Sequence, residues 1–181
     1  APKLKTFEKK DRYPATMIQT ATFYEMLQKG TNLNMPTLYQ LDLSIDNERL
    51  KEAIYKTMEA HPGLTMRMEM GEDHAVYQIP QDDYRDYEIK VIHMDDETFD
   101  EESKHLSKTI GPMDKWLFCF EIIETGKRKF LFTDFSHLNS DGRSIGIVAE
   151  DIGKAYDGKE LTSESYTMFE LGEDLAEFWN T

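Results

Sequence analysis

Residues 116–142 read WLFCFEIIETGKRKFLFTDFSHLNSDG, and this stretch decides the fold. Two apolar runs, Trp116–Ile123 and Phe130–Phe135, flank the short polar segment Thr125–Arg128. The pattern predicts a β-hairpin, because two runs of strand length are separated by a turn that contains glycine. Each run is apolar at consecutive positions, so both faces of the hairpin should be covered and it should lie in the middle of a sheet.

The segments around this hairpin alternate between helical and strand patterns. Apolar residues at helical spacing predict helices over 15–29, 46–61, 97–110, 142–156 and 168–178. Asp46 is expected to cap the second of these helices. The last of these helices, at the C-terminal end, is indicated by Met168, Leu171, Leu175 and Phe178. Strand patterns cover 38–45, with Tyr39, Leu41, Leu43 and Ile45 facing inward, the hairpin 64–79, and 87–93. This mixture predicts an α+β fold with a mixed, mostly antiparallel sheet.

Composition excludes several classes of protein. The 181 residues carry a formal net charge of −14, which argues against a nucleic-acid partner because phosphates would be repelled. The apolar runs are too short to cross a bilayer, and the basic N-terminus lacks the apolar core of a secretory signal. The lone cysteine, Cys119, rules out an internal disulfide and a multi-cysteine metal site. We therefore expect a cytoplasmic chain with no membrane contact and no metal.

A histidine emerges where the second strand of the hairpin ends. His137 has rigid support there, and imidazole is the side chain best suited to move a proton near neutral pH. Asp141 could cap the following helix or form an ion pair, and Gly142 would permit a tight turn that a Cβ would obstruct. A lone histidine in a turn is more often structural than catalytic, so both interpretations stay open. His61 and the remaining histidines lack metal-ligand spacing and are expected to be structural or surface residues.

The segment Phe135–Ser144 resembles the HHxxxDG signature of nonribosomal peptide synthetase condensation domains, whose superfamily includes chloramphenicol acetyltransferase. Residues 59–67, EAHPGLTMR, look like the family's R-H-E-x-L-R-T segment. Gly111–Asp114 followed by Trp116–Ile123 looks like the stretch before the HHxxxDG motif. The resemblance runs from about Tyr13 to Trp179. It implies a chloramphenicol acetyltransferase-like two-layer sandwich, with helices packed on the sheet.

The resemblance also implies roles for individual residues. His137 matches the family's second, functionally important histidine, which is placed to take a proton from the attacking amine or to position it. Asp141 matches an aspartate that is read as structural through an arginine ion pair, and Arg67 is a possible partner. Gly142 matches the glycine whose backbone lies near the reacting carbonyl. The family's first histidine is replaced by Ser136.

Two further features set limits on what the chain does. Thr65 and Pro62 stand where the family has arginine and glutamate, which fits a divergent member or one whose catalysis has decayed. A complete condensation domain has two lobes with the active site between them, and this chain ends soon after the helix that follows the motif. We therefore expect residues 1–181 to form a single lobe, the N-terminal half of such a domain, which is incomplete and inactive alone.

The resemblance leads to one function and leaves two alternatives. The leading interpretation is an acyltransferase that joins a carrier-tethered acyl or aminoacyl thioester to an amine, forming an amide in nonribosomal peptide synthesis. Its partners would be the second lobe and the donor and acceptor carrier proteins, which bring the phosphopantetheine; the chain itself would bind no cofactor. The alternatives are an acyltransferase of the same superfamily that uses acyl-CoA, and a degenerate lobe that docks a carrier without catalysis.

Overall fold

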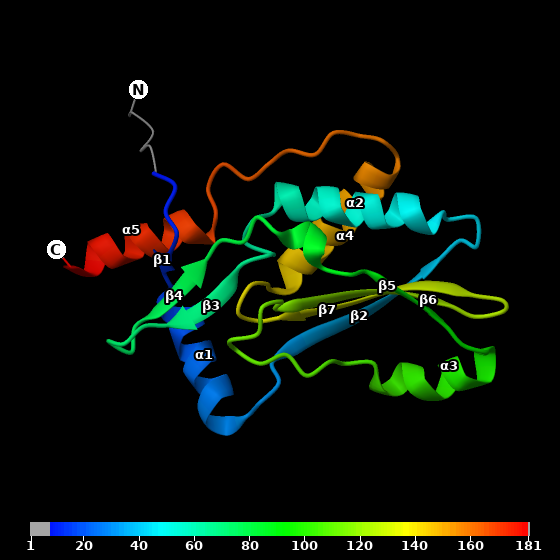
Figure 1. The fold of residues 1–181 in the computed structure, drawn as a ribbon, viewed down its shortest axis with the longest axis horizontal. Helices are drawn as coiled ribbons and strands as arrows, with labels where there is room; N and C mark the ends of the chain where they lie inside the picture. The colour runs from blue at the N-terminus through cyan, green and yellow to red at the C-terminus, as the bar shows by residue number, and fades with distance from the viewer. Residues whose placement is uncertain (1–7, 181) are drawn as a thin grey trace.

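A computed structural model describes residues 8–180, and it centres on a four-stranded sheet (Figure 1). The strands are β2 (Asn34–Leu41), β5 (Lys90–His93), β6 (Phe118–Glu124) and β7 (Lys129–Ser136), in the order β2-β7-β6-β5. The β2–β7 and β6–β7 pairs are antiparallel, whereas β5 runs parallel to β6. The predicted hairpin is the β6–β7 pair, and it occupies the middle of the sheet as its composition required.

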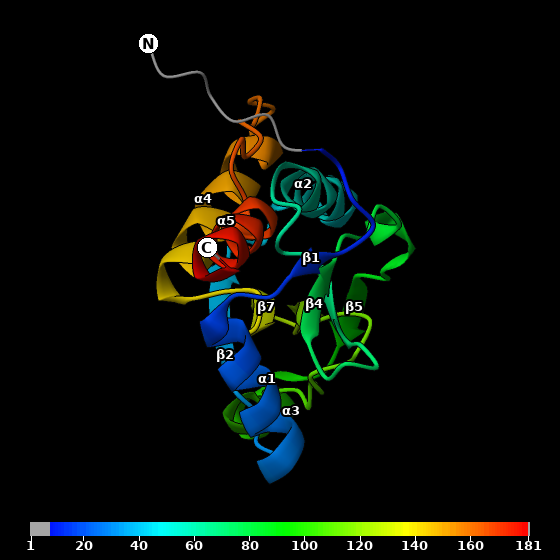
Figure 2. The same cartoon turned by 90° about the vertical axis from the view of Figure 1, so that its left-hand side faces the viewer.

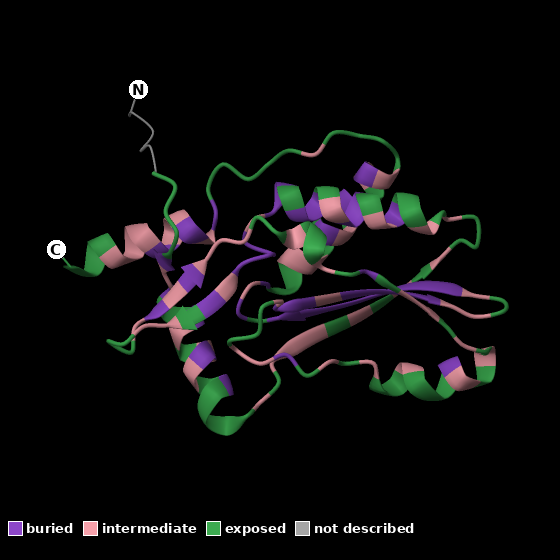
Figure 3. Ribbon diagram, viewed as in Figure 1, coloured by how far each residue is buried: buried purple, intermediate pink, exposed green. Residues whose placement is uncertain are grey.

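The burial of β7 explains its continuous apolar sequence. Each of its residues is buried, since β2 and β6 flank it and other elements cover both faces (Figure 3). The edge strand β2 alternates instead between partly buried and exposed positions, and Pro36, Leu38 and Gln40 face solvent. A strand with one covered face needs apolar residues only at every second position.

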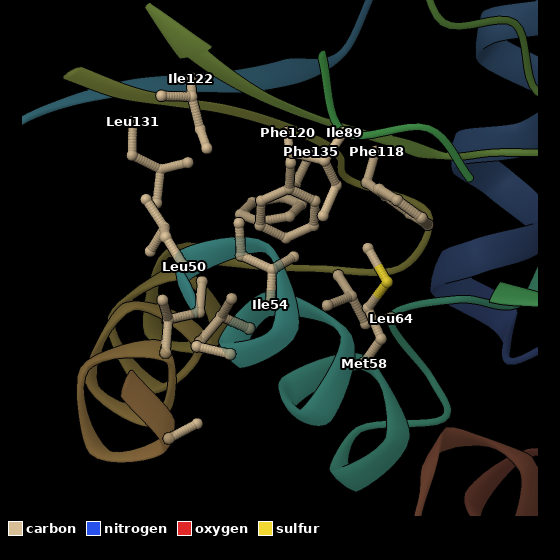
Figure 4. Close-up of a cluster of buried hydrophobic side chains, with 14 residues drawn as sticks. Leu50, Ile54, Met58, Leu64, Ile89, Phe118, Phe120, Ile122, Leu131 and Phe135 are labelled. Carbon is tan, nitrogen blue, oxygen red and sulfur yellow. The ribbon is translucent and has the colours of Figure 1, made fainter. Parts of the chain in front are cut away.

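Helices cover the two faces of this sheet unequally (Figure 1). The helices α2 (Asn47–Ala60) and α4 (Gly142–Tyr156) pack on one face, and the shorter α3 (Asp96–Glu102) lies on the other. Figure 4 shows Leu50, Ile54 and Met58 of α2 directed toward the strands, where they meet buried phenylalanines. On the opposite face the ring of Phe99 stacks on Phe130, with centroids 4.2 Å apart.

A second, smaller sheet forms the other end of the molecule. It contains β1 (Tyr13–Pro14), β4 (Val76–Ile79) and β3 (Arg67–Met70), in the order β1-β4-β3. The helices α1 (Met17–Lys29) and α5 (Met168–Asn180) lie at this end (Figure 2). Their shared core includes Phe23, Met66, Phe169 and Leu138. Because Leu138 directly follows the exposed His137, the turn after β7 is anchored in this second core.

Capping residues in the sequence mark the ends of α1 and the start of α2. The first helix begins with a capping box between Thr16 and Gln19 and ends at Gly30, whose φ of +61° is left-handed. The carboxylate of Asp46 accepts a hydrogen bond from the Arg49 N–H at 2.8 Å, so its predicted role as the cap of α2 is confirmed. The predicted hairpin over 64–79 is the β3–β4 pair.

Other boundaries were predicted wrongly. The strand expected over 38–45 spans Asn34–Leu41 instead, and Leu43 is 60% exposed. Asp42 ends the strand, because its carboxylate accepts hydrogen bonds from the backbone and hydroxyl of Ser44. The helix expected over 97–110 ends at Glu102 and continues only as a single 3₁₀ turn.

The predicted C-terminal helix is α5, but its burial does not follow the apolar spacing that indicated it. Phe169 and Gly172 are its buried residues, whereas Phe178 is 69% exposed. Gly172 lies so close to β1 that a Cβ added to it would be 2.0 Å from the Pro14 carbonyl oxygen. The helix therefore approaches its neighbour through a glycine, which a search for apolar residues at helical spacing does not detect.

Candidate active site

The turn between β7 and α4 is held by neighbouring backbone. The Ser136 N–H donates to the Leu117 carbonyl, and the His137 N–H donates to the Leu33 carbonyl, both at 2.9 Å. The side chain that follows, Leu138, is only 1% exposed. The turn is thus fixed on both sides of the histidine.

The His137 side chain faces outward from this fixed turn. The residue is exposed, although its neighbours Ser136 and Leu138 are 0% and 1% exposed. Within residues 8–180, the structure gives the imidazole no hydrogen-bond or ion-pair partner. Both ring nitrogens are therefore available to accept or donate a proton at an approaching group, which is what a general base or a positioning group requires.

Ser136, which stands where the resemblance implies a first histidine, is buried. Its buried Oγ accepts a hydrogen bond from the Leu138 N–H at 3.3 Å, and its carbonyl accepts one from the Asn139 N–H at 3.2 Å. The hydroxyl thereby stabilises the turn from inside the protein. The Ser136 hydroxyl is therefore not presented at the exposed side of this turn, where the His137 side chain lies.

Asp141 caps the helix α4. One carboxylate oxygen accepts hydrogen bonds from the Ser144 N–H at 2.8 Å and from the Ser144 hydroxyl at 2.7 Å. These bonds, the backbone one first, hold the pKa of the Asp141 carboxyl below its usual value, so the group is ionised at neutral pH. Of the two roles predicted from the local pattern, the structure places Asp141 in the capping role.

Arg67 lies elsewhere and has another partner. It is the first residue of β3, and its guanidinium pairs with Glu69 at 3.1 Å. The two residues are neighbours on one face of the strand, because side chains alternate every second position. In the described part of the chain, Arg67 and Asp141 thus have separate partners, and the predicted ion pair between them is not formed.

Gly142 is the first residue of α4, and its surroundings are open. A Cβ added at this position would have no atom within 4 Å, and the backbone does not need a left-handed conformation. The prediction that a Cβ would obstruct the turn is therefore wrong for this chain. The backbone of Gly142 is accessible from outside.

A small pocket opens beside the motif. Its volume is roughly 100 Å³, and its wall includes Ser140 and Ser144 from the motif region and His61 from the end of α2. Glu164 from the segment before α5 and Met168, the first residue of α5, complete this wall. The pocket is large enough for a few water molecules but too small for a substrate. Polar groups of three segments, among them those of His61, Ser140 and Glu164, meet at this pocket.

His61 links those segments through two carboxylates. Its Nδ1 lies 2.6 Å from Glu164 Oε1, and its Nε2 lies 2.7 Å from Asp151 Oδ2. Because carboxylates only accept hydrogen bonds, both ring nitrogens donate and the ring is an imidazolium. The hydrogen bond to Glu164 raises the pKa of His61, burial opposes it, and Asp151 adds to the increase. The last turn of α2 favours the same positive charge.

The sequence did not reveal this cluster. His61 is structural, as expected, but its partners lie 90 and 103 residues away, so no local spacing relates them. A second contact was missed in the same way: the Asn139 amide donates to the Leu64 carbonyl at 2.7 Å and ties the motif to the segment after α2. The apolar stripe that ends at His61 was the only hint of its burial.

Two classes of site are not formed by the described residues. No group of three or more histidine, cysteine, aspartate or glutamate side chains among them could hold a metal ion. No described helix combines the length and the apolar character needed to cross a bilayer.

Comparison with known proteins places this arrangement in a family. The model of the family described as "Condensation domain" matches residues 9–171. Surfactin synthase subunit 1 of Bacillus subtilis (strain 168) is 29% identical over 161 residues, which cover 85% of this chain and 4% of that protein. The chain therefore spans only a small part of this relative.

Solved structures agree on the fold. A variant of the starter condensation domain of rhizomide synthetase, in complex with C8-CoA, superposes with a TM-score of 0.75 at 12% identity and covers 94% of this chain and 42% of that one. The X-domain from teicoplanin biosynthesis, in complex with OxyB, gives a TM-score of 0.82 at 13% identity, with 99% and 41% covered. The predicted α+β fold of the chloramphenicol acetyltransferase type is thereby confirmed.

The matched span includes the turn that carries His137, the α4 cap Asp141 and the hairpin that supports them. The family model matches most of the chain, and the outward-facing His137 lies within the matched residues. This chain belongs to the condensation-domain family.

Proposed function

We propose that this chain is the N-terminal lobe of a condensation domain and supplies the histidine motif for amide formation in nonribosomal peptide synthesis. The observation that carries the proposal is the exposed side chain of His137, which directly follows the buried strand β7 in a chain of this family. The chain covers less than half of the solved relatives, which supports a single lobe. A second lobe would complete the site.

The proposed reaction transfers an acyl group from sulfur to nitrogen. The amine of the acceptor attacks the carbonyl carbon of the donor thioester, so a C–N bond forms and the C–S bond breaks. The amine loses a proton, which His137 accepts or helps to place, and the departing thiolate of the donor takes up a proton. The thioester is already activated, so alignment of the two substrates supplies much of the rate.

The accessible backbone of Gly142 suits the same reaction. It begins α4, and the first turn of a helix presents N–H groups and a partial positive charge. Negative charge develops on the carbonyl oxygen as the amine attacks, and such donors stabilise it. The absence of atoms within 4 Å of an added Cβ leaves room for the substrate to approach.

The partners follow from this chemistry. Donor and acceptor carrier proteins would each bring a substrate on a phosphopantetheine arm, and this chain itself would hold no cofactor. The second lobe would enclose both arms at His137. We place the reaction in the cytoplasm, with products of the antibiotic or secondary-metabolite class.

Two observations keep alternatives in view. The rhizomide synthetase domain was solved with C8-CoA, which favours a CoA-dependent acyltransferase as the second candidate. The teicoplanin X-domain was solved with a protein partner, OxyB, and the serine at position 136 favours a docking lobe without catalysis as the third.

Replacing His137 in the complete protein that contains this lobe tests the proposal. Donor and acceptor carriers are loaded, and the amide product is followed by mass spectrometry. His137→Ala should lower the rate by about 10²–10⁴-fold, the range for loss of a general acid–base group. His105→Ala, which changes another exposed histidine, is the matched control and should leave the rate unchanged.

The same assay separates the candidates. Amide formation from loaded carriers supports the condensation function, whereas transfer from acyl-CoA alone to a free acceptor supports the second candidate. If His137→Ala is as fast as the unchanged protein, both catalytic candidates are wrong and the docking function is left.

A further inference from the structure

The position of His137 depends on its backbone. Its imidazole has no partner among residues 8–180, so no side-chain hydrogen bond fixes the ring. The residue is held by its own N–H, which donates to Leu33, and by the burial of Leu138 next to it. A hydrogen bond to the Leu138 carbonyl therefore restrains the backbone of the turn from which His137 projects.

A buried amide from α1 performs this task. The Gln19 Nε2 donates to the Leu138 carbonyl oxygen at 3.1 Å, although the two residues are 119 positions apart. The Gln19 side chain is 3% exposed. Its Oε1 accepts a hydrogen bond from the Thr16 N–H at 2.9 Å, so the amide is oriented by the start of its own helix.

A second buried amide completes the network. The Gln19 Nε2 also donates to Gln78 Oε1 at 3.2 Å, and Gln78 is fully buried. The Gln78 Nε2 in turn donates to the carbonyls of Pro14 and Met168, at 2.9 and 2.8 Å. Two amides thus connect the motif turn with α1, β4, β1 and the start of α5.

The network leaves little freedom for rearrangement. Both donors of each glutamine are used, and the acceptor of each is also used, so rotating either amide would leave buried groups unpaired. The close approach of α5 at Gly172, where an added Cβ would lie 2.8 Å from the Gln78 Nε2, closes the network from outside.

We propose that Gln19 is a positioning residue, which holds the Leu138 carbonyl and thereby aims the His137 imidazole at the reacting amine. This role rests on the proposed function of His137. A displacement of about 1 Å at a reacting group can cost about 10²-fold in rate, so a lost tether should act on turnover and not on substrate binding.

The test compares two substitutions of similar shape in the complete protein. Gln19→Met removes the donor to Leu138, whereas Gln78→Met keeps that donor and removes the ties to β1 and α5. Both are assayed with loaded carriers, well below the lower of their melting temperatures. Gln19→Met should lower kcat about 10–100-fold with KM within about twofold, and Gln78→Met should lower kcat less than about threefold.

Hydrogen exchange of the backbone amides supplies a readout that does not need activity. Gln19→Met should speed the exchange of the His137 and Asn139 amides, and Gln78→Met should leave it close to that of the unchanged protein. If Gln19→Met does not fold, Gln19→Leu takes its place, because its apolar side chain also lacks the donor to Leu138.

The outcomes are distinct. If Gln19 variants keep kcat within about twofold, or if Gln78→Met loses as much, Gln19 is only structural and the inference is overturned. His137→Ala is measured alongside. If His137→Ala retains full activity, the proposed function itself fails, and unchanged amide exchange in Gln19→Met would overturn the positioning role separately.

Discussion

The His61 imidazolium gives the sharpest prediction about stability. His61→Gln removes the positive charge between Asp151 and Glu164 and keeps a polar side chain of similar length. A hydrogen bond to a charged group contributes about 1.5–3 kcal/mol when buried, and the Asp151 side chain is only 12% exposed. The Glu164 side chain is 37% exposed, so its ion pair with His61 contributes under about 1 kcal/mol.

We therefore expect His61→Gln to lower the free energy of unfolding by about 2–3 kcal/mol at pH 5.5, since the new amide recovers part of one bond. For a chain of this size, each kcal/mol shifts the melting temperature by about 2–4 °C, which gives a fall of about 4–12 °C. Thermal and urea unfolding followed by circular dichroism measure both quantities.

The stability lost in His61→Gln should decrease as pH rises. The pKa of His61 is raised in the folded state, chiefly by Glu164, so its contribution is complete below the unfolded value of about 6.5 and disappears as pH rises through the folded pKa. Burial pushes the pKa of Asp151 upward, but its bonds to His61 and Lys154 leave it lowered. The Asp151 contribution is therefore present above about pH 4 and lost as pH falls through its folded pKa.

The difference between the two proteins should be largest between about pH 4 and 6.5 and should shrink in alkaline solution. His93→Gln is the control, because the His93 side chain is 72% exposed and its ion pair with Glu124 is long, at 3.4 Å. An equal destabilisation by His61→Gln at pH 5.5 and at a pH well above the folded pKa would refute the charged-ring argument.

Three other substitutions probe the supports of the fold, each measured by urea unfolding. Gly172→Ala should cost about 3 kcal/mol, because its Cβ would sit 2.0 Å from the Pro14 carbonyl; a loss below about 0.5 kcal/mol would mean that α5 packs differently. Asp141→Ala should cost about 1 kcal/mol at neutral pH through the lost bonds to Ser144, and its deficit should vanish as pH falls through the lowered pKa of the carboxyl. Phe120→Ala should cost about 3–5 kcal/mol, because the ring is fully buried beneath α2; a small loss would contradict its place in the core.

Much of the fold was predictable because its signals are local. The apolar runs of β6 and β7 predicted a central hairpin, and Asp46 predicted the start of α2. Periodicity failed where a single residue changed the backbone, as Asp42 does at the end of β2. It also failed for α5, whose closest approach uses Gly172 instead of an apolar side chain.

The candidate site divides in the same way. Sequence alone placed His137 and Asp141 in one short turn between a strand and a helix, because such residues are neighbours along the chain. The parallel pairing of β5 with β6, the ion pairs of His61 and the reach of Gln19 to Leu138 were decided only by the tertiary structure. Hydrophobic spacing records which face of an element is covered, whereas the polar partner of a buried group depends on which distant segment packs against that face.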